Sequence, residues 1–491
     1  MEYQRLSIVM INRMPNTTEI RNAIIESLPA DTSYSGRTPP LEHLYVPATH
    51  LKALRPECQL VVGSRGVGKS VWTAALHDKK LRSLIGSSIA QLDDAEIHIG
   101  FSERPSNIEY PDGETFESLI KMGYKPYIIW RAILIRWLSS FVGKDIPMAK
   151  WPDTVDWVTK NAEEFASITE LANNKLSRKD QFGIILFDAL DRLSSSWQVM
   201  DDIVRGLFRV ALWLKPYSNI LAKIFVREDQ MERTVTDFPD ASKLLSTKAD
   251  LSWARHDLHG LLWQYLLNGP GTSGVLLRDL YHEITGHASR SDNERFLPHD
   301  ECKRDTDIQR SLFEALAGPW MGKDRRRGVP YMWTVGHLSD GQGRTSPRSF
   351  IAAIRQAAED SSERYTEHSY TLHYESIKRG VQKASEIRVE ELSEDYPWVK
   401  PILSSLSGLT VPIQFETMLE KLEETFPEGF TKLEIISHLP PQHIDNGWRG
   451  LREDLITIGV FEERKDGRID MPDLYRVGFG LGRRGGVKPK K

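Results

Sequence analysis

One short stretch constrains the fold of this chain more than any other, because residues 60–72 read LVVGSRGVGKSVW. Here Gly63, Gly68, Lys69 and Ser70 complete the spacing G-x-x-x-x-G-K-[ST] directly after an apolar run. A loop that curls around a triphosphate must turn its backbone N–H groups inward, so side chains have to be absent where it bends. The stretch therefore predicts a buried strand, a phosphate-binding loop and a helix, in that order.

Each residue type in this loop suits one part of a nucleotide bound with Mg²⁺. Lys69 would reach the β and γ phosphates, and the hydroxyl of Ser70 would contact the metal. The helix that follows would direct its positive end toward the anion. The predicted nucleotide-binding residues are Gly63, Ser64, Arg65, Gly66, Val67, Gly68, Lys69, Ser70 and Val71.

Composition limits the classes of protein to consider. The chain has 491 residues, 40% hydrophobic and 27% charged, which is ordinary for a globular protein of roughly two to four domains. Its formal net charge of −4 provides no general basic field, so any binding to nucleic acid must be local. Two cysteines, Cys58 and Cys302, cannot form a disulfide framework, which is consistent with a reducing compartment.

The sequence also argues against association with a membrane. The N-terminal apolar stretch, Ile8–Ile11, is too short for the core of a signal peptide. The most membrane-like segment is residues 127–142, but Arg131 and Arg136 interrupt it. Each of these arginines would cost about 2.5 to 3.5 kcal/mol at the centre of a bilayer. We therefore expect a cytoplasmic protein in which this segment is a buried or amphipathic helix.

Four apolar runs predict the strands of one domain, at residues 60–62, 95–101, 182–187 and 220–226. Uninterrupted apolar runs of this length are typical of parallel strands that are buried on both faces of a sheet. We predict a doubly wound, parallel α/β sheet over residues 51–248. Residues 1–50 are interpreted as a leader that packs on this domain.

After residue 250 the strand patterns give way to helical ones. Residues 257–267 and 348–358 have helical spacing, and we assign residues 249–400 to a helical lid domain. The chain ends in a Gly-rich basic tail, residues 481–491, which we expect to be mobile.

Residues 401–480 show the pattern of a winged helix. An apolar helical face spans residues 415–422, a capping box at 431–434 opens a second helix, and a third helical pattern covers 444–455. Asp466-Gly467 then separates two strand-like arms, which is a strong short-range signal for a hairpin. Three helices followed by a hairpin predict a winged-helix domain.

A phosphate-binding loop needs a carboxylate that holds the metal, normally an aspartate at the end of a neighbouring apolar strand. Asp188, in ILFDALDR, is in that position. The long separation between Lys69 and Asp188 leaves room for residues 95–101 as an intervening strand. An extra strand between the loop strand and the metal strand is the mark of the additional-strand class of P-loop ATPases. We therefore predict that Ser70 and Asp188 bind the metal.

The same region favours ATP over GTP. Guanine-nucleotide-binding proteins would follow the metal aspartate with x-x-Gly and would later show the motif N-K-x-D. Here Ala189, Leu190 and Asp191 follow Asp188, and the nearest approach to the second motif, Asn174–Ser177, lacks the aspartate. ATP with Mg²⁺ is the expected ligand.

The order of phosphate loop, hhhhDxxDR strand, third apolar strand, helical lid and winged helix resembles the AAA+ and STAND ATPases. Within that group the chain is most similar to bacterial STAND or KAP-type members and to the origin-recognition type. The resemblance covers roughly residues 45–480, but only the loop and the metal strand are specific motifs. It implies an ATP-driven switch that acts on a protein partner or effector and in some cases forms a homo-oligomer. Because several bacterial branches act against phage, it also implies a role in antiviral defence.

The family pattern places Asp188 on the metal, directly or through water, and most members have a water-activating Glu immediately after this aspartate. In this chain the position is Ala189. Asp191 is the nearest carboxylate and Glu228, after the third apolar strand, is another; either could orient water. The departure predicts slow hydrolysis, which suits a switch that holds ATP for long periods.

Two arginines are predicted to sense the γ-phosphate. Arg227 follows residues 220–226, where the sensor strand of the family usually offers a polar group. Arg348 lies just after a helix start formed by Ser346 and Pro347, where the second sensor arginine of the family commonly sits. The alternative for both residues is an ordinary surface arginine.

Two other functions stay open at this point. One is a DNA-binding ATPase of replication, partition or transposition, in which residues of the predicted winged helix would contact DNA phosphates: Trp448, Arg449 and Arg452 on the third helix, and Arg464, Lys465 and Arg468 in the wing. Residues 401–491 carry 13 Lys or Arg against 14 Asp or Glu, which is not the charge of a strong duplex binder, so an interaction or autoinhibitory domain is preferred. The other is a nucleotide-stabilised scaffold with little turnover, which Ala189 supports.

Overall fold

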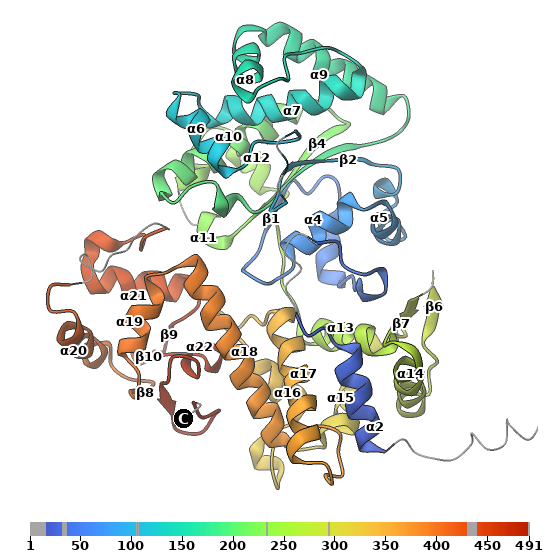
Figure 1. Cartoon of the computed structure of the whole chain (residues 1–491), viewed down its shortest axis with the longest axis vertical. Coiled ribbons are helices and arrows are strands. Elements are labelled where there is room, and N and C mark those ends of the chain that lie inside the picture. The colour runs from blue at the N-terminus through green and yellow to red at the C-terminus, as the bar shows by residue number, and fades with distance from the viewer. Residues whose placement is uncertain are drawn as a thin grey trace, which may run out of the picture. The chain divides into compact units, whose positions relative to one another are not determined.

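The computed structural model describes residues 16–31, 37–104, 106, 108–231, 234–292, 295–429 and 439–489. The chain forms two compact units, and Figure 1 labels their elements. Unit 1 comprises residues 1–32, 254–388 and 472–491, and unit 2 comprises residues 33–253 and 389–471. The phosphate-binding loop belongs to unit 2.

A five-stranded parallel sheet forms the centre of unit 2 (Figure 1). The strands are β1 (Leu60–Val62), β2 (Glu96–Phe101), β3 (Gly183–Phe187), β4 (Ile220–Val226) and β5 (Ala249–Asp250), in the order β2-β3-β4-β1-β5. Leu60 pairs with Ile224, and Gly183 pairs with Ile220. The predicted α/β fold with a parallel sheet is confirmed, as are all four predicted strands. The short edge strand β5 was not predicted.

The strand that separates β1 from β3 is β4. Residues 95–101 were expected in that place, and this expectation is wrong, because β2 lies at the edge of the sheet beside β3. An extra strand does stand between the loop strand and the metal strand, as the additional-strand class requires. All the strands are parallel, so their carboxyl ends lie at the same end of the sheet. The phosphate loop, Asp188 and Arg227 follow these ends and therefore lie near one another.

Helices cover both faces of this sheet, with α4 and α5 on one side of the strands and α7 to α10 on the other (Figure 1). Trp130 of α7 is buried against Phe101 and Phe187, and its Nε1 donates to the carbonyl of Ile203 at 2.9 Å. The helices of this part are α3 (Leu51–Leu54), α4 (Lys69–His77), α5 (Lys79–Gly86), α6 (Gly113–Lys121), α7 (Pro126–Val142), α8 (Trp151–Lys160), α9 (Ala162–Ser177), α10 (Trp197–Leu214), α11 (Glu228–Met231) and α12 (Ala241–Leu245).

Helix α7 is the segment whose sequence is most membrane-like. Its two arginines make contacts with neighbouring residues inside the protein. The guanidinium of Arg131 lies 4.0 Å from the ring centroid of Phe165. Arg136 donates from Nε to Thr154 Oγ1 at 2.8 Å and lies over the ring of Trp151. The predicted buried helix is confirmed, and no helix within the described ranges is long and apolar enough to cross a membrane.

Unit 1 is mostly helical, as predicted for the lid. Its elements are α2 (Thr17–Ser27), α13 (Arg255–Leu267), α14 (Gly271–Thr285), β6 (Arg290–Asp292), β7 (Arg295–Leu297), α15 (Thr306–Ala317), α16 (Pro330–His337), α17 (Pro347–Arg364), α22 (Asp473–Arg476) and β11 (Gly482–Arg483). Helix α18 (Tyr374–Asp395) begins in unit 1, and its residues from Val389 onward belong to unit 2. One helix is therefore shared by both units.

Only part of the leader packs on the nucleotide domain as predicted. Residues 37–50 belong to unit 2, but α2 packs against α14 and α17 in unit 1. Arg21 of α2 is fully buried, and its guanidinium donates to the carbonyl oxygens of Thr366, His368, Tyr370 and Thr371. Because a buried guanidinium needs such acceptors, these bonds fix α2 in unit 1. The prediction that the leader packs on the nucleotide domain is wrong for this helix.

The C-terminal boundary also differs from the prediction. The expected winged-helix domain ended at residue 480, but residues from Pro472 onward belong to unit 1. The expected mobile tail is packed as far as Val487, whose N–H donates to Asp473 Oδ2 at 3.1 Å. The carbonyl of Val487 accepts from Arg476 Nη2 at 2.6 Å. Buried Arg476 therefore attaches the start of the basic tail to α22.

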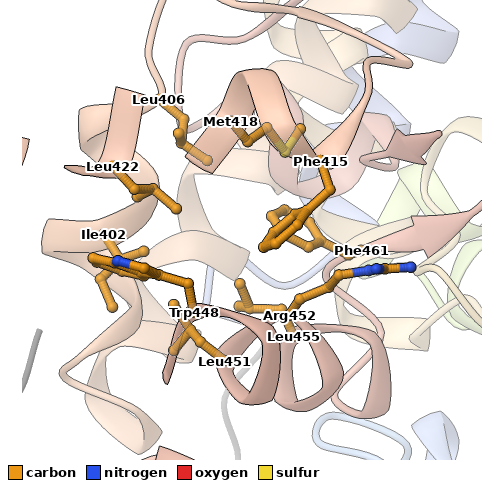
Figure 2. Close-up of a pocket in the computed structure, with 10 residues that line it drawn as sticks. All are labelled: Ile402, Leu406, Phe415, Met418, Leu422, Trp448, Leu451, Arg452, Leu455 and Phe461. Atoms are coloured by element: carbon orange, nitrogen blue, oxygen red, sulfur yellow. The ribbon is translucent and has the colours of Figure 1, made fainter. Parts of the chain in front are cut away.

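Residues 399–471 contain α19 (Val399–Ser405), β8 (Thr410–Val411), α20 (Phe415–Thr425), α21 (Gly447–Thr457), β9 (Glu462–Glu463) and β10 (Ile469–Asp470). The β9–β10 hairpin turns at Gly467, which has a φ of 80°, and Ile413 bridges to Ile469. The helices enclose an apolar core (Figure 2) lined by Ile402, Leu406, Phe415, Met418, Leu422, Trp448, Leu451, Arg452, Leu455 and Phe461. Two helices and the hairpin match the predicted winged helix; the predicted helix opened by Thr431 lies outside the described residues.

Candidate nucleotide site

The phosphate-binding loop joins β1 to α4, and its glycines determine its shape. Gly66 and Gly68 have φ angles of 77° and 108°, which side chains rarely tolerate. A Cβ on Gly63 would lie 2.7 Å from Val67 Cγ1. Helix α4 begins at Lys69, so the N–H groups of its first turn lie at the end of the loop. The backbone therefore fits an anionic phosphate group.

Lys69 lies across this loop. Its Nζ donates to the carbonyl oxygens of Gly63 at 2.7 Å and Ser64 at 2.9 Å. Burial, followed by the nearby charge of Arg227, lowers the pKa of Lys69 to about 8. An ammonium group whose charge is disfavoured in this way gains from an approaching anion. The side chain therefore fits its predicted position at the β and γ phosphates.

Asp188 and Ser70 are brought together, as the prediction of a metal site requires. Asp188 follows β3 directly and is 2% exposed, and its N–H donates to the carbonyl of Phe101 at 2.9 Å. Burial raises the pKa of Asp188, and a hydrogen bond from the Ser70 hydroxyl partly offsets this. A hydroxyl and a carboxylate in contact are the hard oxygen ligands that Mg²⁺ uses beside substrate phosphates. These two residues fit Mg²⁺.

Three aromatic side chains, Trp253, Trp72 and His50, form hydrogen bonds that connect the loop to residues around it. Trp253 Nε1 donates to the carbonyl of Val67 at 2.8 Å. His50 accepts from Trp72 Nε1 at 3.1 Å through Nδ1, and its Nε2 lies 3.0 Å from the carbonyl of Ser252. Burial lowers the pKa of His50 to about 4, so the ring is neutral and Nε2 carries the proton that this carbonyl accepts. The end of the leader thus helps to hold the phosphate loop.

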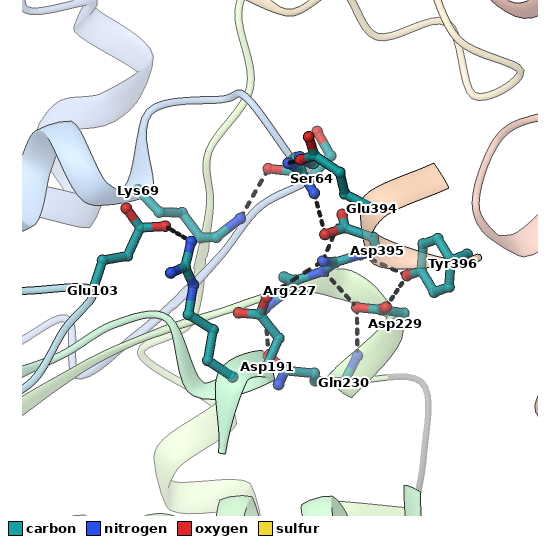
Figure 3. Close-up of polar contacts among 12 residues, drawn as sticks. Ser64, Lys69, Glu103, Asp191, Arg227, Asp229, Gln230, Glu394, Asp395 and Tyr396 are labelled. Atoms are coloured by element: carbon teal, nitrogen blue, oxygen red, sulfur yellow. Dashed lines mark hydrogen bonds and ion pairs between the residues drawn. The ribbon is translucent and has the colours of Figure 1, made fainter. Parts of the chain in front are cut away.

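Arg227 follows β4 and lies in a cluster of acidic groups (Figure 3). Its guanidinium is 2.8 Å from Asp395, 3.3 Å from Asp229 and 3.6 Å from Asp191, and Nη2 donates to the Tyr396 hydroxyl at 2.6 Å. Burial lowers the pKa of Arg227, but Asp229, Tyr396 and Asp395 outweigh burial and hold it well above its ordinary value. The alternative of an ordinary surface arginine is excluded, because its side chain is only 11% exposed.

Arg65, in the loop itself, pairs with the same acidic segment. Its Nη2 lies 2.9 Å from Glu394, and its Nη1 contacts Asp395. Glu394 and Asp395 are the last two residues of α18, and Tyr396 follows them. Within unit 2, the end of α18 therefore binds the phosphate loop through Arg65 and the end of β4 through Arg227.

The structure places the two carboxylates predicted to orient water after β3 and after β4. Asp191 faces Arg227, and Glu228 is half-buried at the start of α11. A cavity of about 360 Å³ opens beside Ser70 and Asp188, but neither predicted carboxylate lines it. Glu103, just beyond the end of β2, does line this cavity.

Arg348 belongs to unit 1 and lies in the first turn of α17, half-buried. The Ser346 side chain accepts from the N–H of Ser349 at 3.3 Å, which confirms the predicted helix start. The predicted sensor role of Arg348 toward nucleotide stays a prediction.

The predicted DNA-contacting residues are partly neutralised within their own domain. Arg452 pairs with Glu463 at 2.6 Å, and Arg464 pairs with Asp470 at 2.5 Å. Arg449 and Lys465 are exposed. The domain therefore presents mixed charge instead of a basic face.

Sequence reasoning missed the groups that come from α18, together with Asp229 and Glu103. The acidic cluster unites residues that are far apart along the chain, and no local pattern indicates such pairing. Glu103 could have been found from the sequence, because it follows a predicted strand. In a parallel sheet the carboxyl end of that strand lies at the same end of the sheet as Asp188.

No protein-family model matches the chain, and no curated protein matches it. Solved structures similar to it include the Aeropyrum pernix ORC2 protein in ADPNP-ADP complexes, at 13% identity, covering 92% of this chain and 93% of that chain, with a TM-score of 0.31. Another is the Aeropyrum pernix ORC1 protein in complex with DNA, at 13% identity, covering 89% and 92%, with a TM-score of 0.33. At these TM-scores the likeness says nothing about nucleotide or DNA binding by this chain.

Proposed function

We propose that this chain binds ATP with Mg²⁺ at residues 63–71 and acts as a nucleotide-dependent switch. The observation that carries the proposal is the pairing of Arg65 and Arg227 with the last residues of α18 beside a loop that fits a triphosphate. ATP is preferred over GTP because the chain lacks the guanine-reading motif.

The switch rests on competition between two kinds of anion for the same two arginines. Asp395 contacts both Arg65 and Arg227. A triphosphate in the loop would bring its charge next to these guanidinium groups, and Arg forms strong bidentate contacts with phosphate. Binding would therefore weaken the hold on the end of α18. Because α18 has residues in both units, the release of its last residues would be felt along a helix that both units contain.

The chemistry at the site is ATP hydrolysis at a low rate. When bound, Mg²⁺ would neutralise charge that develops on the phosphate oxygens. Lys69 would orient the β and γ phosphates, and Ser70 with Asp188 would hold the metal. Because Ala189 replaces the usual base, a long-lived ATP state is expected, and it would give a protein partner or effector time to respond.

The experiment that tests the switch is hydrogen–deuterium exchange with ATP or ADP in excess Mg²⁺. We expect faster exchange of the peptide covering residues 389–396 with ATP than with ADP or without nucleotide. Peptides from α9 serve as an internal control and should not change. Equal exchange at 389–396 in all three states, with ATP shown to be bound, would contradict the switch and leave nucleotide binding intact.

The biological role that we propose is the control of a protein partner or effector in antiviral defence. Formation of a homo-oligomer is one way in which the chain would exert that control. DNA binding is the second candidate, and the pairing of Arg452 and Arg464 with carboxylates disfavours it. Titration of labelled duplex at low salt separates the two. Salt-dependent binding that is lost on neutralising Arg449 and Lys465 would favour the DNA-binding ATPase.

A further inference from the structure

We propose that Glu103 is the general base that activates water for ATP hydrolysis, in place of Asp191 or Glu228. The inference rests on the proposed function, because it concerns the same site. It starts from the sheet, in which β2 and β3 are adjacent and Phe101 pairs with Phe187. The N–H of Asp188 donates to the carbonyl of Phe101, so the residues after both strands emerge side by side. Glu103 is therefore placed beside the metal aspartate by the sheet itself.

The cavity beside the metal residues gives Glu103 access to the reacting atoms. Its walls include Ser70 and Asp188 on one side and Glu103 on the loop after β2. Its volume of about 360 Å³ can hold several water molecules, at about 30 Å³ for each. A water molecule next to the γ-phosphate can thus lie within the same space as the Glu103 carboxylate.

Two contacts hold Glu103 in place. Arg192 Nη2 donates to Glu103 Oε1 at 2.7 Å, and the Glu103 side chain is 22% exposed. Ser102, the residue before Glu103, is held by buried Tyr110, whose hydroxyl lies 2.9 Å from Ser102 Oγ. Within the described part of the chain, Arg192 is the one hydrogen-bond partner of the Glu103 carboxylate, so Oε2 can accept a proton. Arg192 acts here as a positioning residue.

The other two carboxylates lack this access. Asp191 faces Arg227 at 3.6 Å, in the acidic cluster that holds α18. Glu228 starts a four-residue helix after β4, the strand next to the loop strand, and it does not line the cavity. Neither residue shares the cavity with the pair that fits the metal.

The step itself is a balanced hydrolysis. Glu103 Oε2 takes a proton from water while the water oxygen bonds to the γ-phosphorus. The bond between that phosphorus and the oxygen bridging to the β-phosphate breaks, which leaves ADP and inorganic phosphate. Glu103 then returns its proton to solvent. A positioned general base of this kind accelerates a reaction by about 10²- to 10⁴-fold.

The test compares Glu103→Gln with Glu109→Gln in the full-length protein. Glu109 lines the same cavity from the same loop, so it controls for the loss of one negative charge there. We expect phosphate release to fall by about 100-fold or more in E103Q and to stay within twofold in E109Q. Glu103→Asp, which keeps the carboxylate but shortens it, should fall between these values.

Two readouts that do not depend on turnover complete the test. Affinity for a fluorescent ATP analogue should stay within twofold in E103Q. Nucleotide extracted from E103Q after prolonged incubation should remain ATP, while the wild type should hold ADP. E103Q turning over at a third of the wild-type rate or more would overturn the proposal, as would loss of turnover in Asp191→Asn alone.

The failure of this proposal differs from the failure of the proposed function. A wild type that binds ATP but never converts it would overturn the assignment of Glu103 and leave ATP binding standing. A wild type that does not bind ATP at all would overturn both.

Discussion

The two halves of the candidate nucleotide site are built in different ways. The phosphate loop is local, since residues 63–70 supply its turn, its cation and its metal hydroxyl within a single segment. The acidic cluster around Arg227 is assembled from three distant parts of unit 2: Asp191, Asp229 and the end of α18. The difference suggests that the loop determines whether nucleotide binds, whereas the cluster determines what binding changes. The first two of the following predictions each perturb one half and measure both, and the last two concern the loop.

The largest expected effect is on the local half. Lys69→Ala removes the ammonium that would contact the β and γ phosphates, and a hydrogen bond to a charged group contributes about 1.5 to 3 kcal/mol. Since 1.4 kcal/mol is a factor of ten, ATP affinity should fall by roughly 10- to 150-fold in isothermal titration calorimetry. The pairing of Arg65 with α18 should persist, so exchange of residues 389–396 should stay at the wild-type level without nucleotide. Unchanged ATP affinity would refute the assignment of the loop.

The second prediction perturbs the distant half. Asp395→Asn removes the carboxylate shared by Arg65 and Arg227, which should free positive charge for the triphosphate. We expect ATP affinity to rise by up to about tenfold, equivalent to about 1.4 kcal/mol. Residues 389–396 should also exchange faster without nucleotide.

A matched control for this variant lies on the same helix. Glu390→Gln removes a carboxylate that pairs with Lys400, and both side chains are at least half exposed. Exposed pairs contribute little, so this variant should bind ATP like the wild type. Weaker ATP binding in D395N would mean that the acidic cluster supports the loop instead of competing with nucleotide.

The same contrast explains how much the sequence could predict. The strands and the pairing of Ser70 with Asp188 were predictable because apolar runs and the loop spacing are local, and the place of Asp188 follows from the strand that carries it. The positions of α2 and of the end of α18 were not, because Arg21 and Arg65 bind partners more than 300 residues away. The order of the sheet also depends on long-range pairing, which is why β4 and not β2 lies beside the loop strand.

The third prediction uses the pH dependence of Lys69. Burial lowers the pKa of Lys69 to about 8, and a bound triphosphate would favour the charged form, so the pKa should rise on binding. Between the two pKa values binding takes up a proton, and affinity therefore falls as pH rises through 8. We expect a loss of about fivefold from pH 8 to pH 9, where the terminal phosphate is already ionised. Calorimetry in two buffers with different ionisation heats would measure the proton uptake; none at pH 8.5 would contradict the prediction.

The smallest expected effect concerns the hydrogen bond between Trp253 and the phosphate loop. Trp253→Phe keeps a ring against His50 but removes the N–H that donates to the carbonyl of Val67 at 2.8 Å. Loss of one such hydrogen bond costs about 0.5 to 1.5 kcal/mol, so thermal stability should fall slightly and ATP affinity about twofold. Trp398→Phe is the matched control, because within the described residues Nε1 of Trp398 has no hydrogen-bond partner to lose. If the two variants lose ATP affinity equally, the loop does not depend on Trp253, and the glycines with Lys69 are sufficient to maintain its shape.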